Sequence, residues 1–296
     1  MVAHLLRLVY PQWQGGDIAS WFNDLSPKEA AQGYVLGAQI LALLADSIAP
    51  CDTAVVNVAT DFALDSAGRR VVQDGIIDKA ALLQQTKDAL AILAERKPAK
   101  ILTLGGECAV SVPSFCYLAR LYADDVAMLW LDAHPDIGLP DDDFYKGYHA
   151  MAVSAIIGQG GLTQTFGLPA AIAPQKVLLV GLHSDEATHY AARQREFGLK
   201  SLAPEEATDS KNVMQWLEKV GAKKVVIHLD LDVLDPKELY AAVGNTGQMS
   251  IEQVSQIIQD VAQKYDVVGL SVAEHLPQVQ IKLKRLLQGL PLVKEV

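Results

Sequence analysis

The residues most suited to chemistry stand together at positions 131–136, where the sequence reads Leu-Asp-Ala-His-Pro-Asp. This segment directly follows an apolar run at 126–130, so it is predicted to be the polar end of a buried strand. Side chains alternate along an extended chain, which puts Asp132, His134 and Asp136 on one side with Cβ atoms about 6 to 7 Å apart. Two carboxylates and an imidazole suit Mn²⁺, Fe²⁺ or Zn²⁺. The alternative is an ordinary loop after a strand.

A second buried strand, at 225–232, also ends in spaced carboxylates. Asp230 and Asp232 share a face by the same alternation, and two such strand ends side by side would surround one space with about five ligands. Like charges this close are disfavoured unless they are protonated or neutralised, for example by two metal ions. The alternative that these Asp residues cap helices would account for one Asp after each strand, but not for a pair after each of two strands. His228, in the same strand, is predicted to be a core residue or a supporting partner rather than a ligand.

The elements that must position these residues alternate between strands and helices along the whole chain. Strands are predicted near 4–10, 53–59, 101–104, 126–131, 176–181, 198–202, 225–232 and 267–272. Two of the intervening helices are predicted to begin at Ser26 and Pro204 and to end near Ala45 and Val220. Continuous apolar strands between helices indicate a parallel sheet covered on both faces. The polar motifs follow the strands, and both open sheets and barrels place their sites at carboxyl ends of strands.

Composition bounds the class of protein. The 296 residues are 50% hydrophobic and 20% charged, as expected of a globular chain, and they are predicted to form a single domain, 1–296. The net charge of −10 disfavours nucleic acid and anionic membranes as partners and is compatible with a cationic substrate. Three cysteines without Cys-x-x-Cys spacing favour a reduced, cytoplasmic setting. No secretory signal and no membrane-spanning run are expected from the apolar pattern.

Four short motifs, in order along the chain, carry a resemblance to a known family, the ureohydrolases, which include arginase, agmatinase and formiminoglutamase. Gly105-Gly106-Glu107-Cys108 resembles the family's Gly-Gly-Asp-His, and residues 132–136 resemble its Asp-Ala-His-x-Asp. Residues 230–236 resemble its Asp-x-Asp-x-x-Asp-Pro, and Glu274 resembles the Glu that follows its last strand. The resemblance implies an arginase-like, three-layer αβα fold with an eight-stranded, mainly parallel sheet.

The resemblance also implies an activity. It implies a metal-dependent hydrolase of linear amidines in which a hydroxide bridging two Mn²⁺ ions attacks a guanidinium or formimidoyl carbon and releases urea or formamide. It implies metal ligands at Cys108, Asp132, His134, Asp136, Asp230 and Asp232, with Asp132 and Asp230 shared by both ions. Asp136 would also orient the hydroxide, His149 would shuttle a proton, and Glu274 would pair with the guanidinium. Family members are often trimers or hexamers, so a homo-oligomer is expected.

One departure from the family pattern concerns the metal. Cys108 stands where the family has a metal-ligating His, and a thiolate is a softer ligand that shifts preference toward Zn²⁺ or Fe²⁺. Three outcomes are open: Cys108 binds the first metal, a water takes its place, or only the second site is filled. A non-catalytic relative that has lost one metal site is the alternative from another functional class.

Another departure concerns the substrate. Gly138 stands where arginases have an Asn that holds the substrate's α-carboxylate. Glu186 is the closest match to the residues with which arginases bind the α-amino group. Arginine itself is therefore not a secure prediction, and agmatine, another guanidino compound and a formimidoyl amino acid are the substrates left open.

Overall fold

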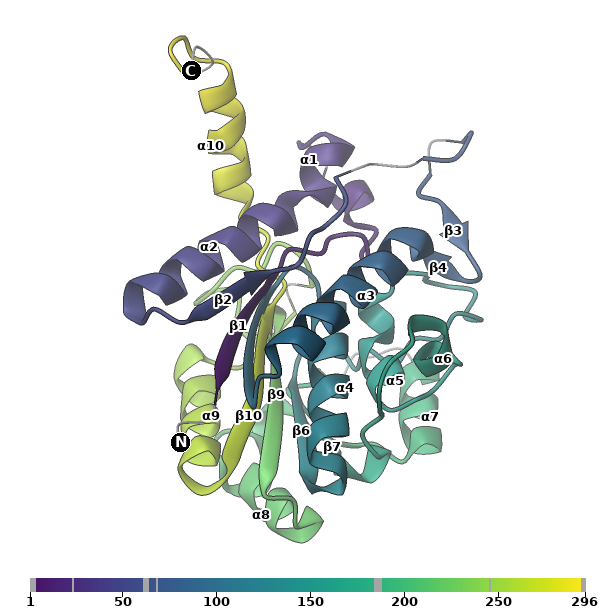
Figure 1. Cartoon of the computed structure of the whole chain (residues 1–296), viewed down its shortest axis with the longest axis vertical. Helices are drawn as coiled ribbons and strands as arrows, with labels where there is room; N and C mark the ends of the chain where they lie inside the picture. Colours follow the sequence, from purple (N-terminus) through teal and green to yellow (C-terminus); the bar gives the residue numbers. More distant parts are fainter. Residues whose placement is uncertain are drawn as a thin grey trace.

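Parallel strands at the centre of the molecule form one sheet in the order β2-β1-β5-β10-β9-β6-β7-β8 (Figure 1). The structure is a computed structural model that describes residues 4–22, 24–60, 64–67, 69–183, 188–244 and 246–293. Within these ranges the sheet strands are β1 (Leu5–Tyr10), β2 (Asp52–Val55), β5 (Lys100–Gly105), β6 (Val126–Leu131), β7 (Val177–Val180), β8 (Lys200–Leu202), β9 (Lys224–Asp230) and β10 (Asp266–Ala273). All neighbouring pairs run parallel, so the predicted eight-stranded sheet is confirmed.

Helices cover both faces of the sheet and give three layers (Figure 1). One face packs against α3 (Lys79–Arg96), α4 (Ser111–Tyr122), α5 (Ala152–Ile156) and α6 (Leu162–Phe166). The other packs against α2 (Gly33–Ile48), α8 (Lys211–Val220) and α9 (Ile251–Lys264). Residues of β6 alternate between the two layers, with Trp130 in the first core and Leu129 and Leu131 in the second. Because both faces are buried, the strands read as continuous apolar runs.

The remaining elements lie around this framework. They are α1 (Pro27–Ala31), α7 (Thr188–Phe197), α10 (Gln278–Gln288) and a small antiparallel hairpin of β3 (Val72–Gln73) and β4 (Ile76–Ile77). The short 3-10 turns include η1 (Ile18–Trp21), η2 (Cys108–Val110), η4 (His149–Met151), η6 (Pro204–Glu206) and η7 (Leu231–Val233). Several of these turns directly follow the polar motifs and fix where those side chains point.

The helix predicted from Ser26 is interrupted. Ser26 caps α1 in a capping box with Glu29, but the continuous helix predicted to reach about Ala45 breaks at Gln32 before α2 begins. Gly33 has low helix propensity, and a Cβ built on it would lie 2.8 Å from a side chain of α10. The close approach of α10 therefore selects a glycine at the point where the helix bends.

Two other predicted boundaries are wrong. The helix predicted from Pro204 begins only at Lys211, because Pro204–Glu206 forms the short turn η6 and a loop follows it. At the end of this loop the backbone N–H of Lys211 donates to the side chain of Asp209 at 2.9 Å. The strand predicted over 53–59 is limited to β2, Asp52–Val55, at one edge of the sheet where only β1 is available for pairing.

Four neighbouring strands, β5, β10, β9 and β6, bring the polar motifs together because their carboxyl ends lie side by side. Gly106 joins these ends: its N–H donates to the Tyr10 carbonyl at 3.0 Å, and its carbonyl accepts the Glu274 N–H at 2.7 Å. A Cβ on Gly106 would lie 1.8 Å from the carbonyl oxygen of Gln12. Only glycine therefore fits where the loop after β1 crosses the end of β5.

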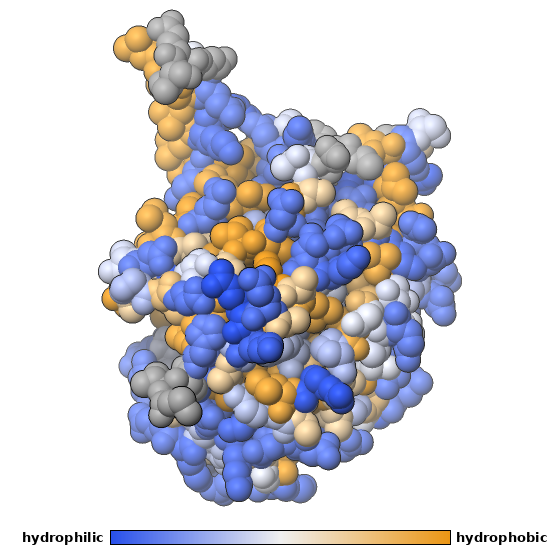
Figure 2. Space-filling model, viewed as in Figure 1, coloured by the Kyte–Doolittle hydropathy of each residue, from blue (hydrophilic) through white to orange (hydrophobic). Residues whose placement is uncertain are grey.

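Helix α10 projects from the body of the molecule and carries an apolar surface (Figure 2). Its base is fixed by Ile281, which is buried with Leu276, and by Arg285, whose Nη2 donates to Glu29 at 2.7 Å. Large exposed apolar residues on α10 and just after it are Val279, Leu283, Leu286, Leu287, Leu290, Leu292 and Val293. Leu43, Leu44 and Ile48 are exposed in the same way on α2.

The stretch Lys28–Ile48 is the one described segment long and apolar enough to cross a membrane by length and composition. A mostly buried core helix and a signal sequence both pass the same test, and 24% of this window is buried. No uninterrupted apolar run is expected there from the sequence, because polar residues such as Gln32, Gln39 and Asp46 divide it. In this structure the stretch contains α1 and α2, and Arg7 of β1 donates to Asp46 and to the Ala49 carbonyl at the end of α2.

Replacing Gly106 with alanine should destabilise the protein by at least about 2 kcal/mol, because the new methyl group must displace the Gln12 carbonyl. Calorimetry of the metal-free protein would show this as a melting temperature lower by several degrees. Gly289→Ala is the control, since its φ is −88° and its Cβ would meet only the Leu286 carbonyl, at 3.3 Å. A Gly106→Ala variant as stable as the parent would show that the strand ends do not require this close approach.

Candidate active site

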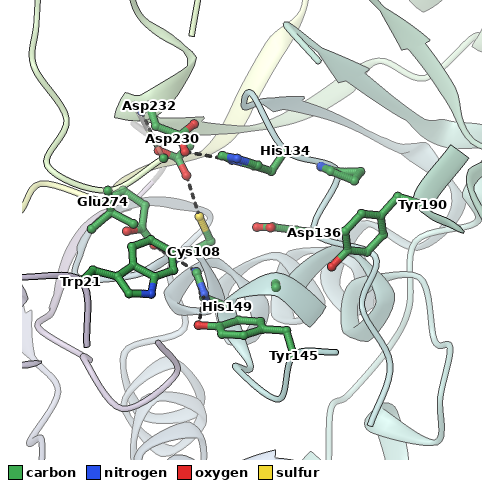
Figure 3. Close-up of a pocket in the computed structure, with 14 residues that line it drawn as sticks. Trp21, Cys108, His134, Asp136, Tyr145, His149, Tyr190, Asp230, Asp232 and Glu274 are labelled. Carbon is green, nitrogen blue, oxygen red and sulfur yellow. Dashed lines mark hydrogen bonds and ion pairs between the residues drawn. The ribbon is translucent and has the colours of Figure 1, made fainter. Parts of the chain in front are cut away.

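Carboxylates, an imidazole and a thiol converge at the carboxyl ends of the central strands (Figure 3). Nδ1 of His134 lies 2.9 Å from Oδ2 of Asp232 and 3.5 Å from Oδ1 of Asp132. The Cys108 thiol donates to Oδ2 of Asp230 at 3.0 Å. Two groups have one donor atom per residue within 4.8 Å of one another: Asp132, His134 and Asp232, and Cys108, Asp132, His228 and Asp230. The shared Asp132 makes the arrangement suited to two adjacent metal ions.

Backbone N–H groups orient the carboxylates after each strand. The Asp232 N–H donates to Oδ1 of Asp230 at 2.7 Å, and the His134 N–H donates to Oδ1 of Asp132 at 2.6 Å. These are tight local turns in which an Asp side chain accepts from the backbone two residues later. The indole of Trp130 donates to Oδ2 of Asp132 at 2.9 Å. The local turns therefore hold the side chains in place before any ligand binds.

Burial governs the protonation of this cluster in the metal-free protein. It raises the pKa values of Asp132, Asp136 and Asp230, and repulsion from neighbouring carboxylates raises them further. Burial alone would lower the pKa of His134, but the carboxylates of Asp232 and Asp132 outweigh it and raise that pKa. The metal-free cluster thus holds protons at positions where cations could neutralise the same charges.

Two buried polar atoms at this site have no hydrogen-bond partner among the described residues, Oδ2 of Asp136 and Nε2 of His228. An unpartnered buried polar atom costs about 1–3 kcal/mol, so such atoms indicate a missing ligand. Asp136 and Glu274 also have positive φ angles, 48° and 66°, as do five other described non-glycine residues outside the cluster and the cavity. The donor set, its buried charge and its unpartnered atoms fit a metal centre.

A cavity of about 210 Å³ opens beside the cluster. Its described lining residues are Trp21, Cys108, His134, Pro135, Asp136, Tyr145, His149, Ala150, Tyr190, Asp230, Asp232, Val243, Gly244 and Glu274. None of these is a Lys or an Arg, whereas several are acidic. Figure 3 shows Trp21 beside Glu274, with Tyr190 on the opposite side of the cavity. The volume suits a small molecule, and the lining suits one that carries positive charge.

The orientation of His149 is set by Tyr145. The Tyr145 oxygen accepts the Asp17 N–H at 3.0 Å and lies 2.8 Å from Nε2 of His149. Since the hydroxyl already accepts from Asp17, it can donate its own hydrogen to His149, which places the imidazole hydrogen on Nδ1. Nδ1 of His149 lies 3.6 Å from Oε1 of Glu274. Burial, with the nearby His134, lowers the pKa of His149 to about 4, so its ring is neutral at pH 7.

Glu274 presents a carboxylate to the cavity from the end of β10. The Cys108 N–H donates to its Oε1 at 3.1 Å, and the Tyr34 hydroxyl donates to its Oε2. Burial raises the pKa of Glu274 to about 8. A cation beside this group would stabilise its ionised form, so the residue is suited to recognising a positively charged ligand.

Glu107 supports the loop that forms one wall of the cavity. Its carboxyl group accepts from Nε2 of Gln12 at 2.6 Å and from the Ala109 N–H at 2.7 Å. A Cβ on Gly15 would lie 2.3 Å from the Glu107 carboxylate, and the Gly15 carbonyl accepts the His149 N–H at 3.1 Å. Burial raises the pKa of Glu107 to about 7. The network thus connects the Gly-Gly-Glu-Cys motif to the His149 backbone.

Every predicted site residue that the structure describes lies in the cluster or lines the cavity, and their individual roles stay predictions. Glu186 lies outside the described residues. His228 joins the cluster although it was predicted to be a core or supporting residue. The strand alternation could have identified it, because His228 lies two residues before Asp230. Trp21 and Tyr190 carry no such signal, since they come from η1 and α7, away from any motif.

A family model described as the Arginase family matches residues 34–292 of this chain. The arginase of Glycine max is 29% identical over 213 residues, which cover 70% of this chain and 55% of that protein. The chain therefore spans about half the length of the curated relatives that it matches.

Solved structures extend the likeness over almost the whole chain. Arginase from Bacillus caldovelox superimposes with a TM-score of 0.73 at 18% identity, covering 98% of this chain and 100% of that one. Arginase from Entamoeba histolytica, in complex with L-ornithine, gives a TM-score of 0.69 at 15% identity, covering 94% of this chain and 92% of that one. These structures agree with the three-layer, arginase-like fold expected from the sequence.

Metal affinity should rise with pH, because the raised pKa values of Asp132, Asp136 and Asp230 leave protons that a metal ion must displace. Calorimetric titration of metal-free protein between about pH 6 and 8, in buffers of different ionisation enthalpy, measures both affinity and protons released. The expected result is tighter binding at higher pH with net proton release. Affinity that is constant over this range, with no proton release, would contradict the assignment of these groups as ligands.

In Tyr145→Phe the imidazole hydrogen of His149 should no longer be confined to Nδ1, because Nε2 loses the hydroxyl that donates to it. The ¹⁵N shifts of labelled imidazole nitrogens report the tautomer directly, and we expect a mainly Nδ1–H ring in the parent and a mixture in the variant. Tyr190→Phe is the control, since Tyr190 also lines the cavity but its ring packs edge-on against Phe144. An unchanged His149 tautomer in Tyr145→Phe would remove the positioning role of Tyr145.

Proposed function

Because the chain belongs to the arginase family, we propose that it hydrolyses a C–N bond in a small, cationic guanidino compound and releases urea. The observation that carries the proposal is the placement of Glu274 and the carboxylate cluster around one small cavity without a described Lys or Arg. A planar guanidinium forms paired hydrogen bonds with a carboxylate, and Glu274 offers one at the wall of the cavity. The chain belongs to the arginase family, and both its hydrolytic activity and the substrate named here are proposed.

The arginase family depends on a binuclear metal centre, and the residues present fit one. We assign one ion to His134, Asp132, Asp230 and Asp232, and the other to Asp132, Asp136, Asp230 and Cys108. When bound, two metal ions would supply a water-derived nucleophile at neutral pH. Mn²⁺ is the expected metal, with Fe²⁺ or Zn²⁺ as alternatives because of the Cys108 thiol.

Glu274 would orient the substrate, and His149 with Tyr145 would transfer the proton. Glu274 would hold the guanidinium in the plane that exposes its carbon to the metal side of the cavity. His149 would pass a proton from Nδ1 to the leaving amine nitrogen while its Nε2 takes one from the Tyr145 hydroxyl. A solvent proton would then bind Nδ1 as Nε2 returns its proton to the Tyr145 oxygen, which restores the starting tautomer. The ring begins and ends neutral, in agreement with its lowered pKa.

The structure around Gly138 favours substrates without an α-carboxylate. The Gly138 N–H donates to the Ala150 carbonyl at 2.7 Å, and a Cβ on Gly138 would lie 2.8 Å from that oxygen. No side chain fits there, so the anchor that arginases use at this position is replaced by backbone. Carboxylate groups would also meet an acidic cavity. We therefore favour agmatine or a similar carboxylate-free guanidino compound over arginine and over formimidoylglutamate.

A homo-oligomer is part of the proposal. Family members are generally oligomeric, and the exposed apolar residues of α10 and α2 offer a surface that a second copy could cover. The number of subunits, three or six, is an expectation from the family resemblance.

A substrate panel tests the activity. Protein loaded separately with Mn²⁺, Fe²⁺ and Zn²⁺ is assayed for urea from agmatine and arginine and for formamide from formimidoylglutamate. We expect urea release, with kcat/KM for agmatine exceeding that for arginine by about tenfold or more, since arginine would place an unpartnered carboxylate in the cavity. Product from none of these compounds, at full metal content, would refute the proposal and favour a non-catalytic relative.

Asp230→Asn is the matching variant, and it should lose bound metal and urea release together. Asp230 is a member of one donor group, and its Oδ1 accepts the N–H of Asp232, a member of the other. Asp209→Asn is its control, since that exposed residue lies outside the cluster and Asn can still accept the Lys211 N–H. An Asp230→Asn variant with full metal content and full turnover would overturn the site assignment.

A further inference from the structure

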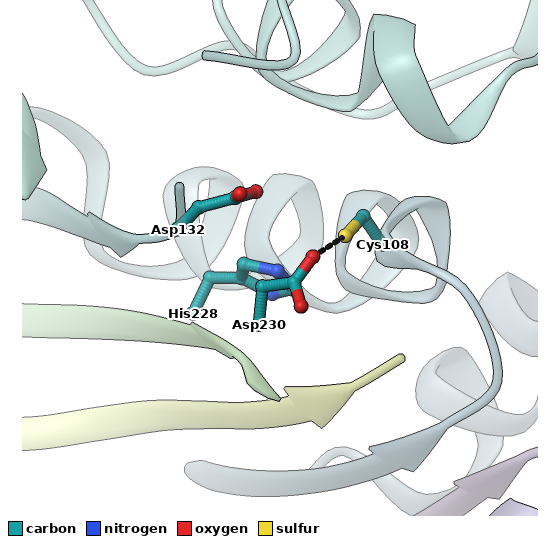
Figure 4. A group of neighbouring side chains, drawn as sticks. All are labelled: Cys108, Asp132, His228 and Asp230. Carbon is teal, nitrogen blue, oxygen red and sulfur yellow. Dashed lines mark hydrogen bonds between the residues drawn. The ribbon is translucent and has the colours of Figure 1, made fainter. Parts of the chain in front are cut away.

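The position between Asp132 and Asp230 has two unusual side chains, Cys108 and His228 (Figure 4). One donor atom from each of the four residues lies within 4.8 Å of the others. Ligands at about 2.0 to 2.3 Å from one ion lie at most about 4.6 Å apart, so the four atoms are close to the spacing that a single ion requires. Figure 4 shows the His228 imidazole next to the Asp230 side chain, with Asp132 on one side and Cys108 on the other.

The surroundings of His228 leave one ring nitrogen for a ligand. Nδ1 lies 2.8 Å from the Ser111 hydroxyl and 2.9 Å from the Ser271 hydroxyl, while Nε2 is buried without a partner among the described residues. With its hydrogen on Nδ1, the ring would keep a free lone pair on Nε2. With its hydrogen on Nε2, a buried N–H would have no acceptor, which costs about 1–3 kcal/mol.

The ring is also held rigidly in place. It stacks on Trp130, with ring centroids 3.7 Å apart, and the same indole donates to Asp132. Ser111 comes from the start of α4 and Ser271 from β10, so three elements converge on one buried imidazole. Metal-ligating histidines are oriented in this way, by a hydrogen bond on the nitrogen that does not bind the ion.

We propose that His228 Nε2 and Cys108 Sγ together replace the imidazole missing from the Gly-Gly-Glu-Cys motif, so that the metal position assigned above to Cys108, Asp132, Asp136 and Asp230 also takes the His228 imidazole and is selective for Zn²⁺, Co²⁺ or Fe²⁺ over Mn²⁺. Sulfur and nitrogen donors favour these ions, whereas Mn²⁺ favours oxygen. The ligand lost at position 108 is thereby recovered from β9, which lies two strands away from β5 in the sheet, and Asp132 and Asp230 remain shared with the second ion. The inference rests on the metal centre of the proposed function but not on its substrate.

X-ray absorption at the zinc edge tests the proposal on the unmodified protein. Metal-free protein receives Zn²⁺ in increments, and we expect a sulfur shell at about 2.3 Å and imidazole scattering near 2.0 Å. Cys108→Ser should lose the sulfur shell, while Cys116→Ser, a buried thiol outside the cluster, should keep it. Zinc-loaded parent protein without a sulfur shell would overturn the role of Cys108 whether or not any variant folds.

Titration with Zn²⁺ and Mn²⁺ tests His228. His228→Phe keeps a flat ring against Trp130 and removes both nitrogens, and we expect its Zn²⁺ affinity at this position to fall by about 100-fold or more, with one imidazole fewer in the absorption spectrum. His4→Gln is the control, because His4 is exposed and pairs with Asp52 far from the cluster. Unchanged Zn²⁺ affinity and imidazole scattering in His228→Phe would refute the role of His228.

The Cys108→His variant makes a further check by restoring the motif of the family. It should raise Mn²⁺ affinity relative to Zn²⁺, and an unchanged preference would contradict the selectivity assigned to the thiol. These readouts are independent of turnover. A sulfur shell and a required His228 in a protein that releases no urea would refute the proposed function and leave this site intact, whereas urea release without sulfur ligation would do the reverse.

Discussion

The constraint on which the rest of the structure depends is the burial of several carboxylates at one edge of a parallel sheet. Asp132 and Asp230 come from neighbouring strands, and each is almost entirely inaccessible to solvent. Such a concentration of negative charge is tolerable only with protons or cations among the carboxylates. Hydrogen bonds from the tight turns after each strand and from the Trp130 indole stabilise part of this negative charge. The negative charge that remains suits the site to metal ions and to a positively charged ligand.

The fold was largely predictable, because its main signals are local. Apolar strands between capped helices indicated the parallel sheet, and Ser26 and Ser250 begin helices with capping boxes as their sequences suggest. The errors arose where long-range contacts decide. The break at Gln32 depends on α10 packing against Gly33 from the far end of the chain. The pattern of apolar residues within 26–48 gives no sign of that contact.

The site was predictable as far as its motifs extend. Spacing after strand ends indicated His134 and the four Asp carboxylates, whereas His149 and Glu274 were assigned from the family resemblance alone. The partners of these residues were not predictable, because they come from elsewhere in the chain: Tyr34 from α2 reaches Glu274, and Gln12 from the loop after β1 reaches Glu107. His228 was predicted to be a core or supporting residue and is buried as predicted, and its position two residues before Asp230, on the same strand face, also brings its ring into the cluster.

The positive φ angles of Asp136 and Glu274 have an evolutionary consequence. A left-handed backbone costs about 1 kcal/mol or more at a residue with a Cβ, and glycine would relieve it at either position. Selection for heat resistance alone would therefore favour losing these two carboxylates. Descendants that no longer need a carboxylate at 136 and 274 should show glycine or asparagine there among their earliest changes.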